Sequence, residues 1–336
     1  MSTLRWGILA PGKIARSFAN DLALLPDMEV AAVGSRSLAN ATTFAERYGG
    51  TPYGSYAELV ADPDVDVVYV ASPHALHDEH ARLALDAGKA VLCEKALTLD
   101  GPSTEALCTY AREQGLFFME AMWTACHPLV RALLAGLEAG RFGVPRQVIA
   151  DLGFVVDAAP TSRLLDLALG AGALLDMGIY PVTLARLVLG EPVAQRAVAN
   201  VVDGVDLDIA ISAVHADGAL SSSTASMTAN SPRRATIATD TGILDLGENF
   251  HHPQRITWTP FSGRDKDAFA AEAVEELEPV EPVVGRGYGN EALEVARCLD
   301  AGLLESPLVP HAQTIGVMGQ LDEIRAQVGV TYPSAG

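Results

Sequence analysis

The sequence is short of basic residues and of cysteine. Its 23 lysines and arginines stand against 42 aspartates and glutamates, and the formal charge of -19 argues against nucleic acid or an anionic membrane as a partner. The cysteines follow no CxxC or zinc-like spacing, so we expect buried free thiols in a reducing compartment. They are Cys93, Cys108, Cys126 and Cys298.

Two kinds of segment are also missing. No basic region with an apolar core precedes the first expected strand, and no uninterrupted apolar run reaches membrane-spanning length. We therefore expect a soluble protein of the cytoplasm. With 336 residues, of which 49% are hydrophobic and 19% charged, the chain is long enough for roughly two ordered globular domains.

Strand and helix patterns alternate over the first 120 or so residues. Such alternation is typical of an α/β protein with a doubly wound parallel sheet. The expected strands are Leu4–Leu9, Glu29–Gly34, Val65–Ala71, Val91–Lys95 and Leu116–Met122.

A glycine turn follows the first of these strands. Ala10-x-Gly12-x-x-Ala15 fits the dinucleotide fingerprint G-x-G-x-x-G/A with alanine in the first position, although plain strand-to-helix turns also have this form. A nucleotide P-loop is the weaker interpretation, because Ile14 stands where a Ser or Thr must reach magnesium. The candidate cofactor-binding residues of this turn are Ala10, Pro11, Gly12, Lys13 and Ile14.

The second strand ends in Ser35-Arg36-Ser37, about where an acid would bind the ribose of NAD. An acid there would repel a 2′-phosphate, whereas Arg36 and two flanking hydroxyls offer donors to that phosphate. We therefore expect NADP(H) as the preferred cofactor and NAD(H) as a possible one. The alternative is that Arg36 stacks on adenine or lies in solvent.

The segment Val91-Leu92-Cys93-Glu94-Lys95-Ala96 is an apolar run that ends in an acid and a base. The carboxyl ends of parallel strands face the ligand crevice, so we expect Glu94 and Lys95 beside the cofactor and Lys95 as the catalytic acid or base. The alternative is that Glu94 and Lys95 are a surface charge pair without a catalytic role, where the strand meets solvent.

The strand before it closes in Ser72-Pro73-His74, which we also assign to the cofactor crevice together with His77. His74, His77 and His80 recur at intervals of three, but no nearby carboxylate or cysteine completes a metal-ligand set, so we expect no metal. His80 is interpreted as an ordinary helix residue.

A second polar cluster lies beyond residue 128. If Ala173–Leu189 is one helix, Asp176 and Tyr180 share a face at its N-terminal end, where they are candidate catalytic and substrate-binding groups. The alternative is an Asp that caps the helix and a Tyr that fills the core. Alternating stretches from residue 193 to residue 259 predict a mostly antiparallel sheet, one face of which could serve subunit association. The acidic stretch Glu272–Pro282 is expected to be a solvated helix end and loop, and helices are expected at about Gly289–Asp300 and Gln313–Gln327.

Several of these segments together resemble the glucose-fructose oxidoreductase / inositol dehydrogenase (Gfo/Idh/MocA) family. Within it they are similar to the branch of trans-dihydrobenzenediol dehydrogenases and NADP-dependent D-xylose dehydrogenases. Two departures are Ala10 and Ala96, where many members have Gly and Pro. The segments are Gly7–Ala15, Cys93–Thr98, Met119–Trp123, Gly172–Pro181, Gly287–Ala292 and Leu321–Pro333.

The resemblance implies a Rossmann domain, placed at 1–123, and a substrate-binding and oligomerisation domain, placed at 124–336, that forms a homodimer or homotetramer through an open sheet. It implies hydride transfer between a nicotinamide and a carbinol or carbonyl carbon of a sugar-like or diol substrate. Lys95 would be the acid/base, Asp176 and Tyr180 would complete the polar site, and His77 and Trp123 would flank the substrate. The alternative is a non-catalytic protein that senses a dinucleotide or a sugar on the same fold.

Overall fold

The computed structural model describes residues 3–159, 162–261 and 274–333. It divides into two compact units, of which the first combines Met1–Cys126 with Val283–Met318 and the second combines His127–Pro282 with Gly319–Gly336. The domain boundary expected after residue 123 would place Val283–Met318 in the second domain. In the structure these residues pack with the first unit.

The first unit contains the doubly wound parallel sheet that the sequence predicts. Its strand order is β3-β2-β1-β4-β5-β6, and every neighbouring pair is parallel. The order reverses between β1 and β4, so the loops after these two strands flank the switch point where such sheets bind ligands. The strands are β1 (Leu4–Leu9), β2 (Met28–Gly34), β3 (Thr51–Tyr53), β4 (Val67–Val70), β5 (Ala90–Glu94) and β6 (Phe118–Ala121).

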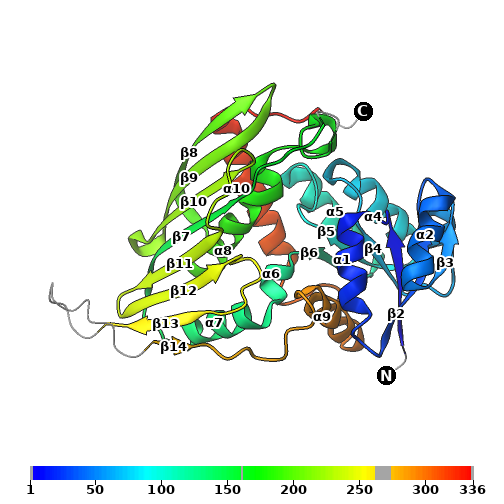
Figure 1. Ribbon diagram of the computed structural model, residues 1–336, viewed down its shortest axis with the longest axis horizontal. Helices are drawn as coiled ribbons and strands as arrows, with labels where there is room; N and C mark the ends of the chain where they lie inside the picture. The colour runs from blue at the N-terminus through cyan, green and yellow to red at the C-terminus, as the bar shows by residue number, and fades with distance from the viewer. Residues whose placement is uncertain (1–2, 160–161, 262–273, 334–336) are drawn as a thin grey trace. The chain divides into compact units, whose positions relative to one another are not determined.

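Helices cover both faces of this sheet (Figure 1). β4 and β5 are buried along their whole length, which explains their nearly continuous apolar sequence. Phe18 of α1 stacks on Tyr69 of β4 with ring centroids 4.1 Å apart. The helices are α1 (Lys13–Leu22), α2 (Leu38–Tyr48), α3 (Tyr56–Val60), η1 (His74–Leu76), α4 (His77–Asp86), α5 (Gly101–Gln114), α6 (Trp123–Cys126), α9 (Tyr288–Asp300) and the start of α10 (His311–Val328).

Helix α9 belongs to this unit because its N-terminus is bound by α1. Asp21 of α1 accepts hydrogen bonds from the amide nitrogens of Arg286 (2.8 Å) and Tyr288 (3.0 Å), and α9 lies beside α1 in Figure 1. Gly287, with φ of 112°, begins the helix without a side-chain cap of its own. A carboxylate from a distant helix therefore satisfies amide groups that a local cap would otherwise bind.

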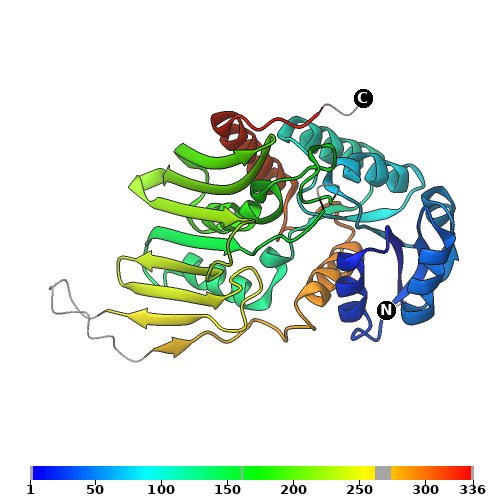
Figure 2. The same cartoon turned by 45° about the horizontal axis from the view of Figure 1, so that its top comes forward.

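The second unit is built on an eight-stranded open sheet in the order β14-β13-β12-β11-β7-β10-β9-β8 (Figure 2). Only the pair β7 and β10 is parallel among these described strands, so the predicted mostly antiparallel sheet is confirmed. The strands are β7 (Pro145–Gly153), β8 (Pro192–Val202), β9 (Val205–His215), β10 (Leu220–Ser226), β11 (Arg234–Thr239), β12 (Gly242–Glu248), β13 (Thr257–Pro260) and β14 (Glu275–Glu276).

Two expectations for this unit need correction. The expected helix Ala173–Leu189 begins as a π-helical segment, η3 (Leu174–Gly178), and continues as α8 (Ile179–Leu189). The acidic stretch expected to be a helix end and loop instead pairs Glu275 and Glu276 with β13, although its first two residues lie outside the described part. The remaining helical elements are α7 (Pro128–Glu138), η2 (Leu167–Leu169) and η4 (Ala216–Gly218).

One helical stretch of the described chain, Leu167–Leu189, is long and apolar enough by length and composition to cross a membrane, although Asp176 and Arg186 interrupt its apolar sequence. Of its most apolar window, 83% is buried inside the protein. Burial of this extent is typical of a core helix, and α8 packs on strands β7 and β10 of the large sheet.

Candidate active site

The loop after β1 has the form of an anion-binding turn. Ala10 has a left-handed φ of 68°, and Gly12 is the extended N-cap of α1. No side chain caps this helix and no acid lies in its first turn, so the amide groups there point to an exposed loop. A Cβ added at Gly12 would meet nothing closer than the Ala10 carbonyl oxygen at 3.9 Å. The turn thus fits a pyrophosphate on the N-terminus of α1.

The end of β2 presents one exposed cation. The hydroxyls of Ser35 and Ser37 accept hydrogen bonds from the amide nitrogens of Ser37 (3.2 Å) and Asn40 (3.4 Å), so both stabilise the turn into α2. Arg36 is exposed and lies near Tyr56, whose pKa burial raises and the Arg36 charge lowers. The group available to a 2′-phosphate is therefore Arg36 more than the two serines.

Lys95 follows directly on the buried strand β5, as expected, and is partly exposed. Its amide nitrogen donates to Glu94 Oε2 at 3.2 Å, and Glu94 Oε1 accepts a short hydrogen bond from the Tyr69 hydroxyl. Burial, followed by the charge of Glu94, raises the pKa of Tyr69, so this phenol remains a donor. Glu94 is thus occupied within the protein on both oxygens, and the peptide bond that follows Lys95 is cis.

His77 braces the ends of β4 and β5. Its side chain is fully buried, with Nε2 at 2.8 Å from the Ser72 carbonyl oxygen and Nδ1 at 2.9 Å from the Ala96 carbonyl oxygen. A neutral imidazole carries one N–H and donates to one carbonyl at a time, and burial lowers the pKa of His77 to about 4. Both nitrogens of this residue, expected beside the cofactor and substrate, therefore face the protein backbone.

The other two histidines of this motif are also buried. His80, interpreted from the sequence as an ordinary helix residue, lies with Nδ1 2.9 Å from the Ser72 hydroxyl, and the His74 ring meets the His77 ring edge-on at 5.7 Å. Across the described residues, no group of three or more His, Cys, Asp or Glu side chains is arranged to hold a metal ion.

Trp123 follows β6 and stacks on Tyr288 with ring centroids 4.2 Å apart and an interplanar angle of 8°. Only 4% of Trp123 is exposed. Because Asp21 binds the Tyr288 amide nitrogen, the helix that returns to this unit also fixes the indole expected to flank the substrate.

In the second unit, Asp176 lies on η3 and Tyr180 on α8, both nearly buried. Asp176 Oδ1 accepts from Arg163 Nη1 at 3.0 Å, so the carboxylate is paired with a cation rather than capping the helix. The Tyr180 ring lies 4.9 Å from the ring of His251, whose ring is 4.5 Å from that of His252. Neither histidine is predicted from the sequence as a site residue. The available signal was the dipeptide His251-His252 directly before a proline.

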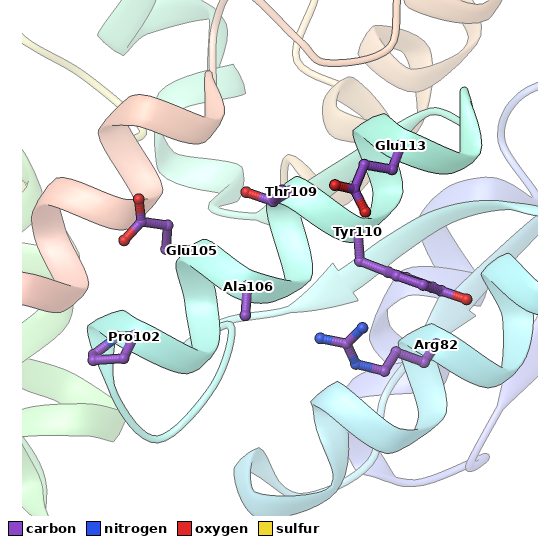
Figure 3. A pocket seen from close by; sticks show the side chains of 7 residues that line it. All are labelled: Arg82, Pro102, Glu105, Ala106, Thr109, Tyr110 and Glu113. Carbon is purple, nitrogen blue, oxygen red and sulfur yellow. The ribbon is translucent and has the colours of Figure 1, made fainter.

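A surface groove of about 520 Å³ lies between α4 and α5 of the first unit (Figure 3). In it the Arg82 guanidinium lies 4.6 Å from the Tyr110 ring centroid and also pairs with Asp78 at 3.0 Å. Its cation is already balanced, and none of the predicted site residues lines the groove.

With this geometry in hand, comparison with known proteins identifies the family. The model described as "Oxidoreductase family, NAD-binding Rossmann fold" matches residues 4–122, and the GFO/IDH/MocA C-terminal domain matches residues 130–245. The chain is 35% identical over 348 residues to trans-1,2-dihydrobenzene-1,2-diol dehydrogenase of Mus musculus, with 98% of each chain covered. The chain belongs to the GFO/IDH/MocA oxidoreductase family.

Other members of the GFO/IDH/MocA family agree with this assignment. D-xylose 1-dehydrogenase (NADP(+)) of Hypocrea jecorina is 34% identical over 98% of this chain and 93% of its own. The solved structure of a 3-ketoreductase from Actinomadura kijaniata, in complex with NADP and TDP-benzene, is 28% identical with a TM-score of 0.83 and covers 97% of this chain. The predicted family and fold class are confirmed, and the protein is an oxidoreductase with a Rossmann domain.

Proposed function

We propose that the protein is an NADP-dependent oxidoreductase that transfers a hydride between nicotinamide and a carbinol or carbonyl carbon of a sugar-like or diol substrate. Relatives that align along nearly the whole chain are named as dehydrogenases of a dihydrodiol and of D-xylose. The name of the D-xylose dehydrogenase includes NADP(+), and the 3-ketoreductase structure is a complex with NADP. The observation that carries the proposal is Lys95, a partly exposed amine at the carboxyl end of a buried strand of a Rossmann sheet.

The residues present fit NADP at its pyrophosphate and at its 2′-phosphate. The uncapped N-terminus of α1 behind Gly12 suits the pyrophosphate, and Arg36 suits a 2′-phosphate. When bound, the cofactor supplies the hydride donor or acceptor, while the protein supplies orientation and proton traffic.

The polar side chains divide the remaining work. Lys95 takes the proton from the reacting hydroxyl in oxidation and returns it in reduction, and Tyr180 is the hydroxyl that assists it. Asp176, held by Arg163 on one oxygen, binds a second substrate hydroxyl with its carboxylate. His77 and Trp123 shape the site from the ends of β4 and β6.

The decisive experiment compares Lys95→Met with Lys89→Met while nicotinamide absorbance is followed over pentoses, hexoses, inositols, dihydrodiols and small dicarbonyls. Acid/base catalysis is typically worth about 10²–10⁴ in rate, so Lys95→Met should lose that much turnover and still bind NADPH. Lys89, whose Nζ donates to the Asp62 and Val65 carbonyls at 2.7 Å, is the matched control and should keep its turnover.

Two results would contradict the proposal. Undiminished turnover in Lys95→Met would remove the lysine from the mechanism. NADPH binding without turnover of any compound in the panel would favour a sensor on the same fold.

We also infer that the protein assembles into a homodimer or homotetramer through the large sheet and works in the cytoplasm. The outer face of that sheet exposes Val198 (72%), Val214 (38%) and Leu220 (48%), and such patches mark association surfaces. The four cysteines are buried and form no disulfide, in keeping with a reducing compartment. Light scattering on the purified protein measures the assembly, and a monomer at micromolar concentration would contradict it.

A further inference from the structure

Glu120 is a buried acid that none of the roles above uses. It lies in β6, which neighbours β5 in the sheet, and only 3% of it is exposed. Its Oε1 accepts from the Leu97 amide nitrogen at 3.1 Å, and its Oε2 accepts from the Thr314 hydroxyl at 3.0 Å. Leu97 is two residues beyond Lys95, so Glu120 ties the turn that carries the lysine to the first turns of α10.

This contact completes a set on the two peptide units that flank the Lys95–Ala96 bond. The Lys95 amide nitrogen is held by the preceding glutamate, the Ala96 carbonyl faces His77, and the Leu97 amide nitrogen is held by Glu120. A turn whose peptide units are held on both sides of the Lys95–Ala96 bond has little freedom in φ and ψ. The direction in which the Lys95 side chain leaves the backbone is thereby set before any ligand binds.

We infer that Glu120 is a positioning residue for Lys95, holding the turn after β5 so that the amine meets the reacting hydroxyl. The inference rests on the proposed catalytic role of Lys95. A side chain needed only to fill this space would be apolar, because a buried carboxylate is expensive unless it is hydrogen-bonded. Both oxygens of Glu120 accept hydrogen bonds, and one of these bonds fixes the lysine turn.

The strength of this hold depends on the charge of Glu120. Burial raises its pKa to about 7, against the opposing effects of Thr314, Leu97 and Lys95. Hydrogen bonds to a carboxylate are roughly twice as strong as those to a neutral acceptor, so the hold weakens as pH falls below about 7. The titratable groups whose charges act on Glu120, or on which its charge acts, are Cys93 and Glu94 on β5, Lys95, and Cys108 on α5. On α10, the ring of His311 lies 5.8 Å from the ring of Phe118, two residues before Glu120.

The test compares Glu120→Ala, Glu120→Gln and the matched control Glu294→Ala in the full-length protein. We expect Glu120→Ala to lower kcat by about tenfold to a hundredfold, with KM and the Kd of NADPH within about twofold, because a misplacement near 1 Å has such an effect. Glu120→Gln keeps a neutral acceptor for Leu97, so its kcat should lie between those of wild type and Glu120→Ala, and the decline of kcat that wild type shows below pH 7 through Glu120 should be absent. Glu294 is 5% exposed and bonded to Arg297 and Ser306, so its loss should leave kcat unchanged.

A second readout does not require turnover. Reductive methylation of the Lys95 amine, quantified by mass spectrometry, should be faster in Glu120→Ala, because a released turn exposes the amine more often, and unchanged in Glu294→Ala. Should Glu120→Ala fail to fold, Thr314→Val removes one partner of the acid and should give intermediate changes. The inference is overturned if the Glu120 variants keep both the labelling rate and the kcat of wild type. If those variants do not fold, the same result in Thr314→Val overturns it. Altered labelling alongside undiminished turnover in Lys95→Met overturns the proposed function instead.

Discussion

Replacing Asp206 with Asn should stabilise the second unit at neutral pH and have little such effect in acid. Asp206 is 1% exposed, and its Oδ2 accepts from the Leu174 amide nitrogen at 2.7 Å, at the start of the segment that carries Asp176 and Tyr180. Burial raises the pKa of Asp206 from 3.8 to about 6, with Leu174 and Arg325 acting in the opposite direction. The carboxyl group is therefore more acidic in the unfolded chain than in the folded protein.

The sign and size of the effect follow from that difference. Between pH 3.8 and pH 6 the folded protein holds a proton that the unfolded chain has lost, so the free energy of unfolding falls as pH rises across this window. A difference near two pKa units corresponds to about 3 kcal/mol, which is the full penalty at pH 7. An asparagine oxygen still accepts from the Leu174 nitrogen and never ionises, so the variant avoids this penalty.

The test is urea unfolding of wild type and Asp206→Asn from pH 4.5 to pH 7.5. The free energy of unfolding of the variant should exceed that of wild type by an amount that grows as pH rises. Asp208→Asn is the contrasting control. Burial raises the pKa of Asp208, but hydrogen bonds from Ser226, Thr228 and Asn200 outweigh burial and lower it. That variant should be less stable than wild type, and because its linkage window lies below pH 3.8 the deficit should stay nearly constant from pH 4.5 to pH 7.5. A constant difference between wild type and Asp206→Asn over the whole range would refute the reasoning.

Two further changes have defined outcomes. Gly172 has φ of 125°, and a Cβ there would lie 2.1 Å from Asp206 Oδ1, so Gly172→Ala should lower the free energy of unfolding by about 2–4 kcal/mol in the same urea assay. A loss below 0.5 kcal/mol would show that this backbone relaxes freely. Arg36→Ala should raise the Kd of NADPH about tenfold or more and change that of NADH little, as measured by nicotinamide fluorescence, since a charge-assisted contact to a 2′-phosphate is worth roughly 1.5–3 kcal/mol. Equal weakening of both cofactors would move Arg36 away from the 2′-phosphate.

The strands of the first unit were predictable because burial on both faces leaves a plain mark on the sequence. The expected run Val91–Lys95 corresponds to β5 (Ala90–Glu94), and the two remain within one residue of each other at both ends. Helix α9 was also predictable from the spacing of its apolar residues, but its packing against the first unit was not. What fixes it to the first unit is Asp21, which is separated from Tyr288 by most of the chain.

Asp176 and Tyr180 were correctly placed on one helical segment, but their surroundings were beyond local sequence patterns. The π-helical turn, the ion pair with Arg163 and the ring of His251 depend on neighbours that tertiary packing brings in. Spacing along a helix indicates which residues share a face, and only the fold determines what that face meets.

The buried acids around Lys95 show where sequence reasoning could have gone further. Glu94 ends β5, and Glu120 lies on the neighbouring strand β6, opposite Cys93 of β5. Glu291 of α9 is fully buried, and burial and the charge of Glu94 raise its pKa. Charged residues are rarely fully buried, so acids at the ends of two adjacent apolar strands are a signal in themselves. Burying them destabilises the folded protein, and such departures from good packing concentrate at functional sites. An acid that interrupts a buried strand beside a candidate catalytic lysine is therefore better interpreted as part of its support than as the edge of a solvated surface.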